Sequence, residues 1–214
     1  MNNQIKQDDS KKNVILPFKM KTGRYYIISI GFLLLLQQTV TAQKDSSGIF
    51  LTANDFVQNR LLYSGSCKKD KHKIKLNDFF GKSYVTIKHR DSIYRVYKKQ
   101  IFGYKWCDGN VYRFKNKKEL LLLNPAEPIL IYKHIISKPP TGLTNVTNYY
   151  FSKGAFSMPL LLTFKNLNKE FSENPLFIDS LKQMFTYNTQ LASYDSYRKV
   201  YVLNSVYKKI IIKP

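Results

Sequence analysis

The chain has 214 residues, of which 35 are Lys or Arg and 14 are Asp or Glu, so its formal net charge is +21 at pH 7. With 43% hydrophobic and 14% aromatic residues, it carries too much core-forming material for a disordered basic tail, a collagen-like chain or a low-complexity segment. A chain of this length buries enough surface to fold without a metal or a dense disulfide network. We therefore expect a strongly basic, tyrosine-rich globular domain.

The N-terminal segment predicts export. Basic residues between positions 19 and 24 precede an uninterrupted apolar stretch at 27–36, and the small residues at 40–42 suit cleavage by a signal peptidase. Residues 1–42 are therefore predicted to be a leader and signal peptide, and the exported protein is expected in the periplasm or at the outer membrane.

Two alternatives to this interpretation of the N-terminus stay open. Signal peptides rarely begin with a long polar leader, so Met20 is an alternative translation start. Counted outward to residues 25–42, the apolar segment is also long enough to act as an uncleaved anchor in the inner membrane.

The basicity belongs to the domain and not to the leader. Residues 1–42 contribute six basic and two acidic groups, so residues 43–214 keep a formal charge of +17. Within them, residues 60–118 hold 17 basic residues against 4 acidic ones. The first half of the domain is therefore the electrostatic face.

The only two cysteines are Cys67 and Cys107. In an exported chain an even pair most simply forms one disulfide, and two unpaired buried thiols are the alternative. The two residues are not in a Cys-x-x-Cys arrangement, so a redox role is disfavoured.

Residues 48–154 show the patterns of a β-rich segment. Asp108-Gly109 is a strong hairpin signal, and Thr52 or Asn54 is placed to cap a brief helical turn. Alternating, β-branched and aromatic residues predict strands at 48–52, 71–76, 84–88, 93–97, 104–106, 111–114, 119–124, 129–136 and 149–151. The stretch 139–147, which begins with two prolines, is predicted to be an exposed loop.

The apolar period changes after residue 159. Pro175 stands at the first position of a predicted helix that runs to Phe185, and apolar residues from Tyr194 to Val206 predict a second helix. The sequence therefore predicts an α+β fold, an antiparallel β-sheet or incomplete barrel followed by packed C-terminal helices. Residues 43–214 form this single domain, β-rich over 48–154 and helical over 170–208.

Several segments together resemble an uncharacterised family of exported proteins of Gram-negative bacteria that has no assigned activity. The segments that carry the resemblance are Gly48–Phe56, Lys73–Phe80, Ile101–Tyr104, Cys107–Phe114 and Tyr194–Ser196. The resemblance implies export and a shared fold, and it carries no catalytic residues.

Motifs for catalysis or cofactor binding are absent from the sequence. His72, His89 and His134 are scattered, and neither a His-Glu-x-x-His motif nor a Cys-x-x-Cys pair occurs. There is no Gly-x-Ser-x-Gly elbow and no glycine-rich phosphate loop. No cofactor or metal is expected, and a non-catalytic protein is favoured over an enzyme.

The basic half is the feature with consequences for partners. On a strand, Lys71, Lys73 and Lys75 share one face, about 6–7 Å apart, and a row of cations attracts anionic polymers or headgroups. Tyrosines lie between these cations, as on surfaces that bind single-stranded nucleic acid. The candidate anion-binding residues are Lys68, Lys69, Lys71, Lys73, Lys75, Lys98, Lys99, Lys105, Arg113 and Lys115.

The export signal makes nucleic acid an unfavoured partner and favours an anionic envelope lipid or glycan, or an acidic protein. The expected function is a non-catalytic envelope protein that binds an anionic surface or partner through a basic β face. The alternatives are a periplasmic hydrolase with an unrecognised site and a subunit of an envelope assembly. Solvated cationic faces that arise from a lysine-rich composition alone are the remaining explanation.

Overall fold

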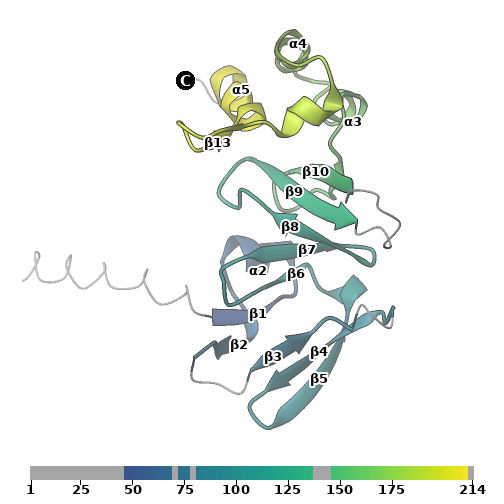
Figure 1. The fold of residues 1–214 in the computed structure, drawn as a ribbon, viewed down its shortest axis with the longest axis vertical. Helices are drawn as coiled ribbons and strands as arrows, with labels where there is room; N and C mark the ends of the chain where they lie inside the picture. The colour runs from purple at the N-terminus through teal and green to yellow at the C-terminus, as the bar shows by residue number, and fades with distance from the viewer. Residues whose placement is uncertain (1–45, 69–71, 78–80, 137–145, 212–214) are drawn as a thin grey trace, which may run out of the picture. The chain divides into compact units, whose positions relative to one another are not determined.

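The computed structural model describes residues 46–68, 72–77, 81–136 and 146–211 (Figure 1). These residues belong to one compact unit, Gln43–Pro214. The predicted signal peptide, the candidate anion-binding residues Lys69 and Lys71, and residues 139–145 of the predicted loop lie outside the described residues. The last two residues of that predicted loop, Val146 and Thr147, belong instead to a strand.

The main sheet has eight antiparallel strands in the order β11-β10-β9-β8-β7-β6-β1-β2. It is open, with β11 and β2 at its edges, and the strands from β6 to β11 follow one another as a meander. The predicted α+β fold with an antiparallel sheet is confirmed. The strands are β1 (Ser46–Phe50), β2 (Leu62–Ser66), β6 (Gly103–Lys105), β7 (Val111–Lys115), β8 (Lys118–Leu122), β9 (Ile129–Ile136), β10 (Val146–Lys153) and β11 (Leu160–Leu161).

A second, smaller sheet contains β3 (Lys73–Lys75), β4 (Tyr84–His89) and β5 (Ser92–Tyr97), in that order. The predicted hairpin over 84–97 is confirmed, with Arg90 at a φ of 55° in its turn. The predicted strand at 71–76 is shorter, because only residues 73–75 pair with β4. A short 3-10 helix, η2 (Lys98–Gln100), leads from β5 to β6.

The helix α2 (Ala53–Val57) follows β1 and is capped as the sequence predicts. The Thr52 hydroxyl accepts a hydrogen bond from the Asp55 N–H at 3.1 Å, and the Asp55 carboxylate accepts one from the Thr52 N–H at 3.0 Å. Arg60 pairs with the same carboxylate. The Thr52 hydrogen bond and then the Arg60 contact lower the pKa of Asp55, because both favour its ionised form.

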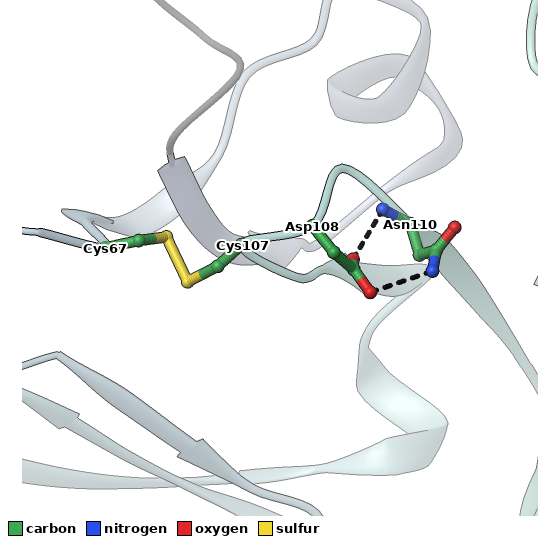
Figure 2. The surroundings of a disulfide bond; sticks show 4 residues. All are labelled: Cys67, Cys107, Asp108 and Asn110. Atoms are coloured by element: carbon green, nitrogen blue, oxygen red, sulfur yellow. Dashed lines mark hydrogen bonds between the residues drawn. A yellow bond between two sulfur atoms is a disulfide. The ribbon is translucent and has the colours of Figure 1, made fainter.

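The Asp108-Gly109 turn joins β6 to β7, and the predicted hairpin is confirmed. Gly109 has a φ of 88°, a conformation that glycine adopts at little cost. The Asp108 carboxylate accepts hydrogen bonds from the main-chain N–H and the side-chain amide of Asn110, both at 2.8 Å (Figure 2). Beside this turn Cys67 and Cys107 form a disulfide with Cα atoms 5.7 Å apart (Figure 2), so the predicted pairing is confirmed.

The C-terminal part contains three α-helices, α3 (Phe164–Glu170), α4 (Pro175–Met184) and α5 (Val202–Ile211). The predicted helix at 175–185 is confirmed as α4, with Pro175 in its first turn and Phe177, Ile178 and Leu181 buried. A 3-10 helix, η3 (Asn188–Ala192), precedes a short hairpin of β12 (Tyr194–Asp195) and β13 (Val200–Tyr201).

The predicted second helix from Tyr194 to Val206 is wrong over its first half. Asp195 accepts hydrogen bonds from the N–H groups of Tyr197 and Arg198, at 3.0 and 2.9 Å, and thereby forms a turn. Side-chain bonds of this kind compete with helix formation, and Lys199 has a φ of 53°, outside the helical region. The helix begins at Val202, and Tyr197 is 94% exposed instead of packed.

The helical region also begins earlier than predicted, at Phe164 instead of residue 170. Thr163 caps α3, because its hydroxyl accepts a hydrogen bond from the Asn166 N–H at 3.2 Å. Thr163 is followed within one turn by Asn166 and not by Glu or Gln, so the capping-box pattern that marks a helix start is missing from the sequence.

Three hydrophobic clusters hold these parts together. The helices pack on one face of the main sheet through Ile129, Ile131 and Phe151, as Figure 1 shows for α3–α5 beside β9 and β10. The opposite face buries Leu130 and Tyr132 together with the residues around α2. The third cluster joins the inner face of the small sheet to the β1, β6 and β7 strands. Side chains alternate along strands, so the outer face of β3–β5 points away from this core.

Candidate anion-binding surface

The outer face of the small sheet carries a set of cations in register. Ile74, Val85 and Ile87 are buried in the core, so the residues between them point outward. Lys73 lies opposite Lys88, and Arg95 lies opposite Thr86 on the same face. We call Lys73, Lys75, Lys88 and Arg95, with the outward Tyr84, Thr86, Ile93 and Tyr97, the cationic sheet face. The strands β3–β5 contain neither Asp nor Glu.

The arrangement of these charges is not explained by the stability of the sheet. Lys73 and Lys88 are direct cross-strand partners, and like charges in that position destabilise a sheet. All four cations of the face are exposed. A counter-anion at the surface would relieve this repulsion, so we treat the face as a candidate anion-binding surface.

Aromatic and apolar side chains lie among the cations. The guanidinium carbon of Arg95 lies 5.5 Å from the centre of the Tyr84 ring, and the Lys82 ammonium lies 5.7 Å from the same ring. Tyr97 contacts Tyr84 edge-on at 6.5 Å. Ile93 is 68% and Tyr97 51% exposed, so the face offers apolar as well as charged contacts.

A cavity of about 520 Å³ extends this cationic region onto the main sheet. Its floor includes Tyr112, Leu121 and Lys133, which are successive cross-strand partners on β7, β8 and β9. Burial raises the pKa of Tyr112, and Asp108 and Glu119 raise it further. Five lysines line the cavity, namely Lys82, Lys98, Lys117, Lys118 and Lys133, against the single carboxylate of Glu119.

Glu119 is already engaged by its neighbours. The Lys98 ammonium lies 3.5 Å from one carboxylate oxygen, and the Tyr104 hydroxyl donates to the other at 3.0 Å. Lys98 is only 3% exposed. The Lys98–Glu119 pair therefore belongs to the internal structure of the cavity wall, and the remaining lysines give the cavity its charge.

Three of the candidate anion-binding residues do not lie on the cationic sheet face. Lys98, Lys105 and Arg113 are buried and do not contribute to an exposed face. Lys105 lies on β6, between β1 and β7, and Arg113 points to the face of Tyr132 and Ser152. The sequence does not show which strands lie inside the sheet, so these cations could not be distinguished from exposed ones.

The other described candidates lie at or near the surface. Lys68, Lys73, Lys75 and Lys99 are exposed. Lys115 is half-buried, with its ammonium 5.0 Å from the centre of the Tyr150 ring, and burial together with the nearby Lys118 lowers its pKa. The surface cations that the candidate set missed include Lys82, Lys88, Arg95, Lys117, Lys118 and Lys133. The strong hairpin over 84–97 was the signal from which Lys88 and Arg95 could have been placed.

Glu119 and His134 both line the cavity, but their side chains point to opposite faces of the sheet. Glu119 lies two residues before Leu121, which pairs with Lys133, so Glu119 and Lys133 share one face of the sheet. His134 follows Lys133 and therefore points to the opposite face, where its ring contacts Tyr150. In the described ranges no group of three or more His, Cys, Asp or Glu side chains is placed to hold a metal ion.

His134 provides a test of the local field at this edge of the sheet. Burial lowers its pKa, and the Lys118 charge lowers it further. We expect Lys118→Gln to raise the pKa of His134, measured by NMR titration of its ring protons. Lys182→Gln, an exposed change on α4, should leave it unaltered; an unaltered pKa in both variants would contradict the influence of Lys118.

Comparison with known proteins gives no assignment, since no protein-family model, curated protein or solved structure matches the chain. Among the helices of the described ranges, none combines the length and apolar character needed to cross a membrane. The function is therefore inferred from the charge and geometry of the surface itself.

Proposed function

We propose that the protein is a non-catalytic, exported envelope protein that binds a membrane surface of phosphorylated, anionic lipids through the cationic sheet face. The observation that carries this function is the register of Lys73, Lys75, Lys88 and Arg95 on strands without any carboxylate. Export is supported by the predicted signal peptide and by the Cys67–Cys107 bridge, because disulfides form in oxidising compartments such as the periplasm.

The exposed apolar side chains favour a lipid surface over a soluble anionic glycan. Ile93 and Tyr97 lie on the same face as the cations and are more than half exposed. At an interface, tyrosine rings sit at the level of the headgroups, while each lysine or arginine near an anionic surface contributes about 1 kcal/mol to binding. The cationic sheet face supplies both kinds of contact together.

Charge reversal on the cationic sheet face tests this function. In the variant Lys73→Glu/Lys75→Glu/Lys88→Glu we expect binding to vesicles that contain phosphatidylglycerol to weaken by about a hundredfold or more, since three lost cations alone cost about 3 kcal/mol. The measurement is vesicle co-sedimentation at low ionic strength, repeated with added salt, which should weaken binding of the original protein.

The matched control reverses three exposed lysines far along the chain, Lys165→Glu/Lys169→Glu/Lys209→Glu, and thus changes the net charge equally. This control should retain most of its vesicle binding. Equal losses in both variants would show that net charge alone governs adhesion and would overturn the proposal. Binding to an anionic glycan or an acidic protein, with none to vesicles, would overturn the lipid assignment.

A further inference from the structure

Arg113 carries a buried charge that has no carboxylate partner in the described part of the chain. The residue is only 5% exposed, and arginine stays protonated in proteins. No carboxylate of residues 46–68, 72–77, 81–136 or 146–211 lies within ion-pair distance of its guanidinium. Buried charges are normally paired, so this position calls for an explanation.

The contacts that hold the guanidinium are neutral. One nitrogen, Nη1, donates to the Tyr132 hydroxyl at 2.9 Å and to the Ser152 hydroxyl at 3.4 Å. Ser152 in turn donates to the Gly154 carbonyl at 2.7 Å, so its only proton is used there. The guanidinium carbon lies 4.5 Å from the centre of the Phe102 ring. This network fixes the orientation of Arg113 through one nitrogen.

The donors on Nε and Nη2 remain for another partner. In the described part of the chain, the side-chain hydrogen bonds of Arg113 come from Nη1. A guanidinium has five N–H donors in a planar fork that matches the oxygens of a carboxylate or a phosphate. The described residues therefore place no acceptor on the Nε and Nη2 side of this fork.

Arg113 lines a cavity of about 330 Å³ whose lining also includes an exposed cation, Lys99. Lys98 and Lys99 from η2, together with the polar side chains of Thr52 and Asn116, line the same cavity. The remaining lining residues include Phe102 and Met158, which are apolar. A buried cation, an exposed lysine and an apolar wall form a site for a small molecule with one anionic end.

We propose that this cavity binds the oxyanion group, a carboxylate or a phosphate, of a small ligand, with Arg113 as its principal contact and Lys99 as a second cation. The site is separate from the cationic sheet face and does not depend on membrane binding. The ligand neutralises the charge of Arg113, while Phe102 and Met158 contact its apolar part.

NMR titration of the Arg113 side chain tests the site directly. The Nε–H resonance, assigned by its loss in Arg113→Lys, should shift saturably on addition of inorganic phosphate or of acetate, with sodium chloride at equal ionic strength as the reference. Saturation by phosphate alone assigns a phosphate ligand, and saturation by acetate assigns a carboxylate. A shift that is equal in all three titrations, or no shift, would overturn the proposal.

Variants at an exposed position keep the test independent of folding. Lys99→Gln should raise the dissociation constant for the bound anion severalfold, while Lys165→Gln on α3 should leave it unchanged. The Lys73→Glu/Lys75→Glu/Lys88→Glu variant should also retain anion binding at Arg113, which distinguishes this site from the cationic sheet face. Identical binding in Lys99→Gln and the original protein would contradict the role of Lys99.

Discussion

Replacing both cysteines, Cys67→Ser/Cys107→Ser, should lower the free energy of unfolding by about 4 kcal/mol. The bridge closes a loop with a sequence separation of 40, and the chain-entropy model gives this magnitude for a loop of that length. The loop contains the whole small sheet, β3–β5, and the strand β6. Its ends are β2, which pairs only with β1 among the described strands, and the turn between β6 and β7.

Chemical denaturation of the original protein, with and without reductant, measures this effect. The double variant is its own control, because reductant should not change its stability. Amide hydrogen exchange should accelerate first in the edge strand β2 and in the small sheet, which lie beside and within the loop that the bridge closes, and less in β9 and β10. A loss of stability below about 1 kcal/mol would show that the bridge does not constrain the unfolded chain as the model requires.

Local chemistry made much of the first half of the fold predictable from the sequence. The Asp108-Gly109 turn needs a residue that tolerates positive φ, and Gly109 adopts a φ of 88°. The hairpin of β4 and β5 and the strand β9 follow directly from β-branched and aromatic runs. Of the two capping residues that the sequence offers, Thr52 and Asn54, Thr52 caps α2. Each of these features depends on residues close together in the chain.

The misassigned features have two causes, a local turn that the apolar pattern does not reveal and contacts between residues far apart in the chain. The apolar residues at Tyr194–Tyr201 are spaced as on a helix face, but this spacing does not exclude the short hairpin that the structure has. The hydrogen bonds that Asp195 accepts form the turn of this hairpin. Lys98 and Arg113 occur in a basic stretch and are nonetheless buried. Their burial depends on partners from other strands, because Lys98 pairs with Glu119 and Arg113 donates a hydrogen bond to Tyr132. The alignment of Lys73 with Lys88 depends likewise on strand register.

Asn204 connects the helix α5 to the main sheet through two buried hydrogen bonds. It is completely buried, and its side chain accepts from the Ile129 N–H at 3.0 Å and donates to the Ile129 carbonyl at 2.9 Å. Ile129 is the first residue of β9, and β8 pairs with β9 further along, at Tyr132 and Lys133. The side chain of Asn204 therefore takes the place of a neighbouring strand at Ile129. Asn124 donates to the same carbonyl at 2.8 Å.

Asn204→Leu should lower the free energy of unfolding by about 3 kcal/mol, because the substitution keeps the volume but leaves the Ile129 N–H buried without its acceptor. For a domain of this size the melting temperature should fall by roughly 6–12 °C. The matched control, Asn168→Leu on the exposed face of α3, should change stability by about 0.5 kcal/mol at most. Calorimetry measures both. Because Asn124 still serves the Ile129 carbonyl, the effect isolates the N–H group, and equal stability of the two variants would show that this N–H finds another acceptor.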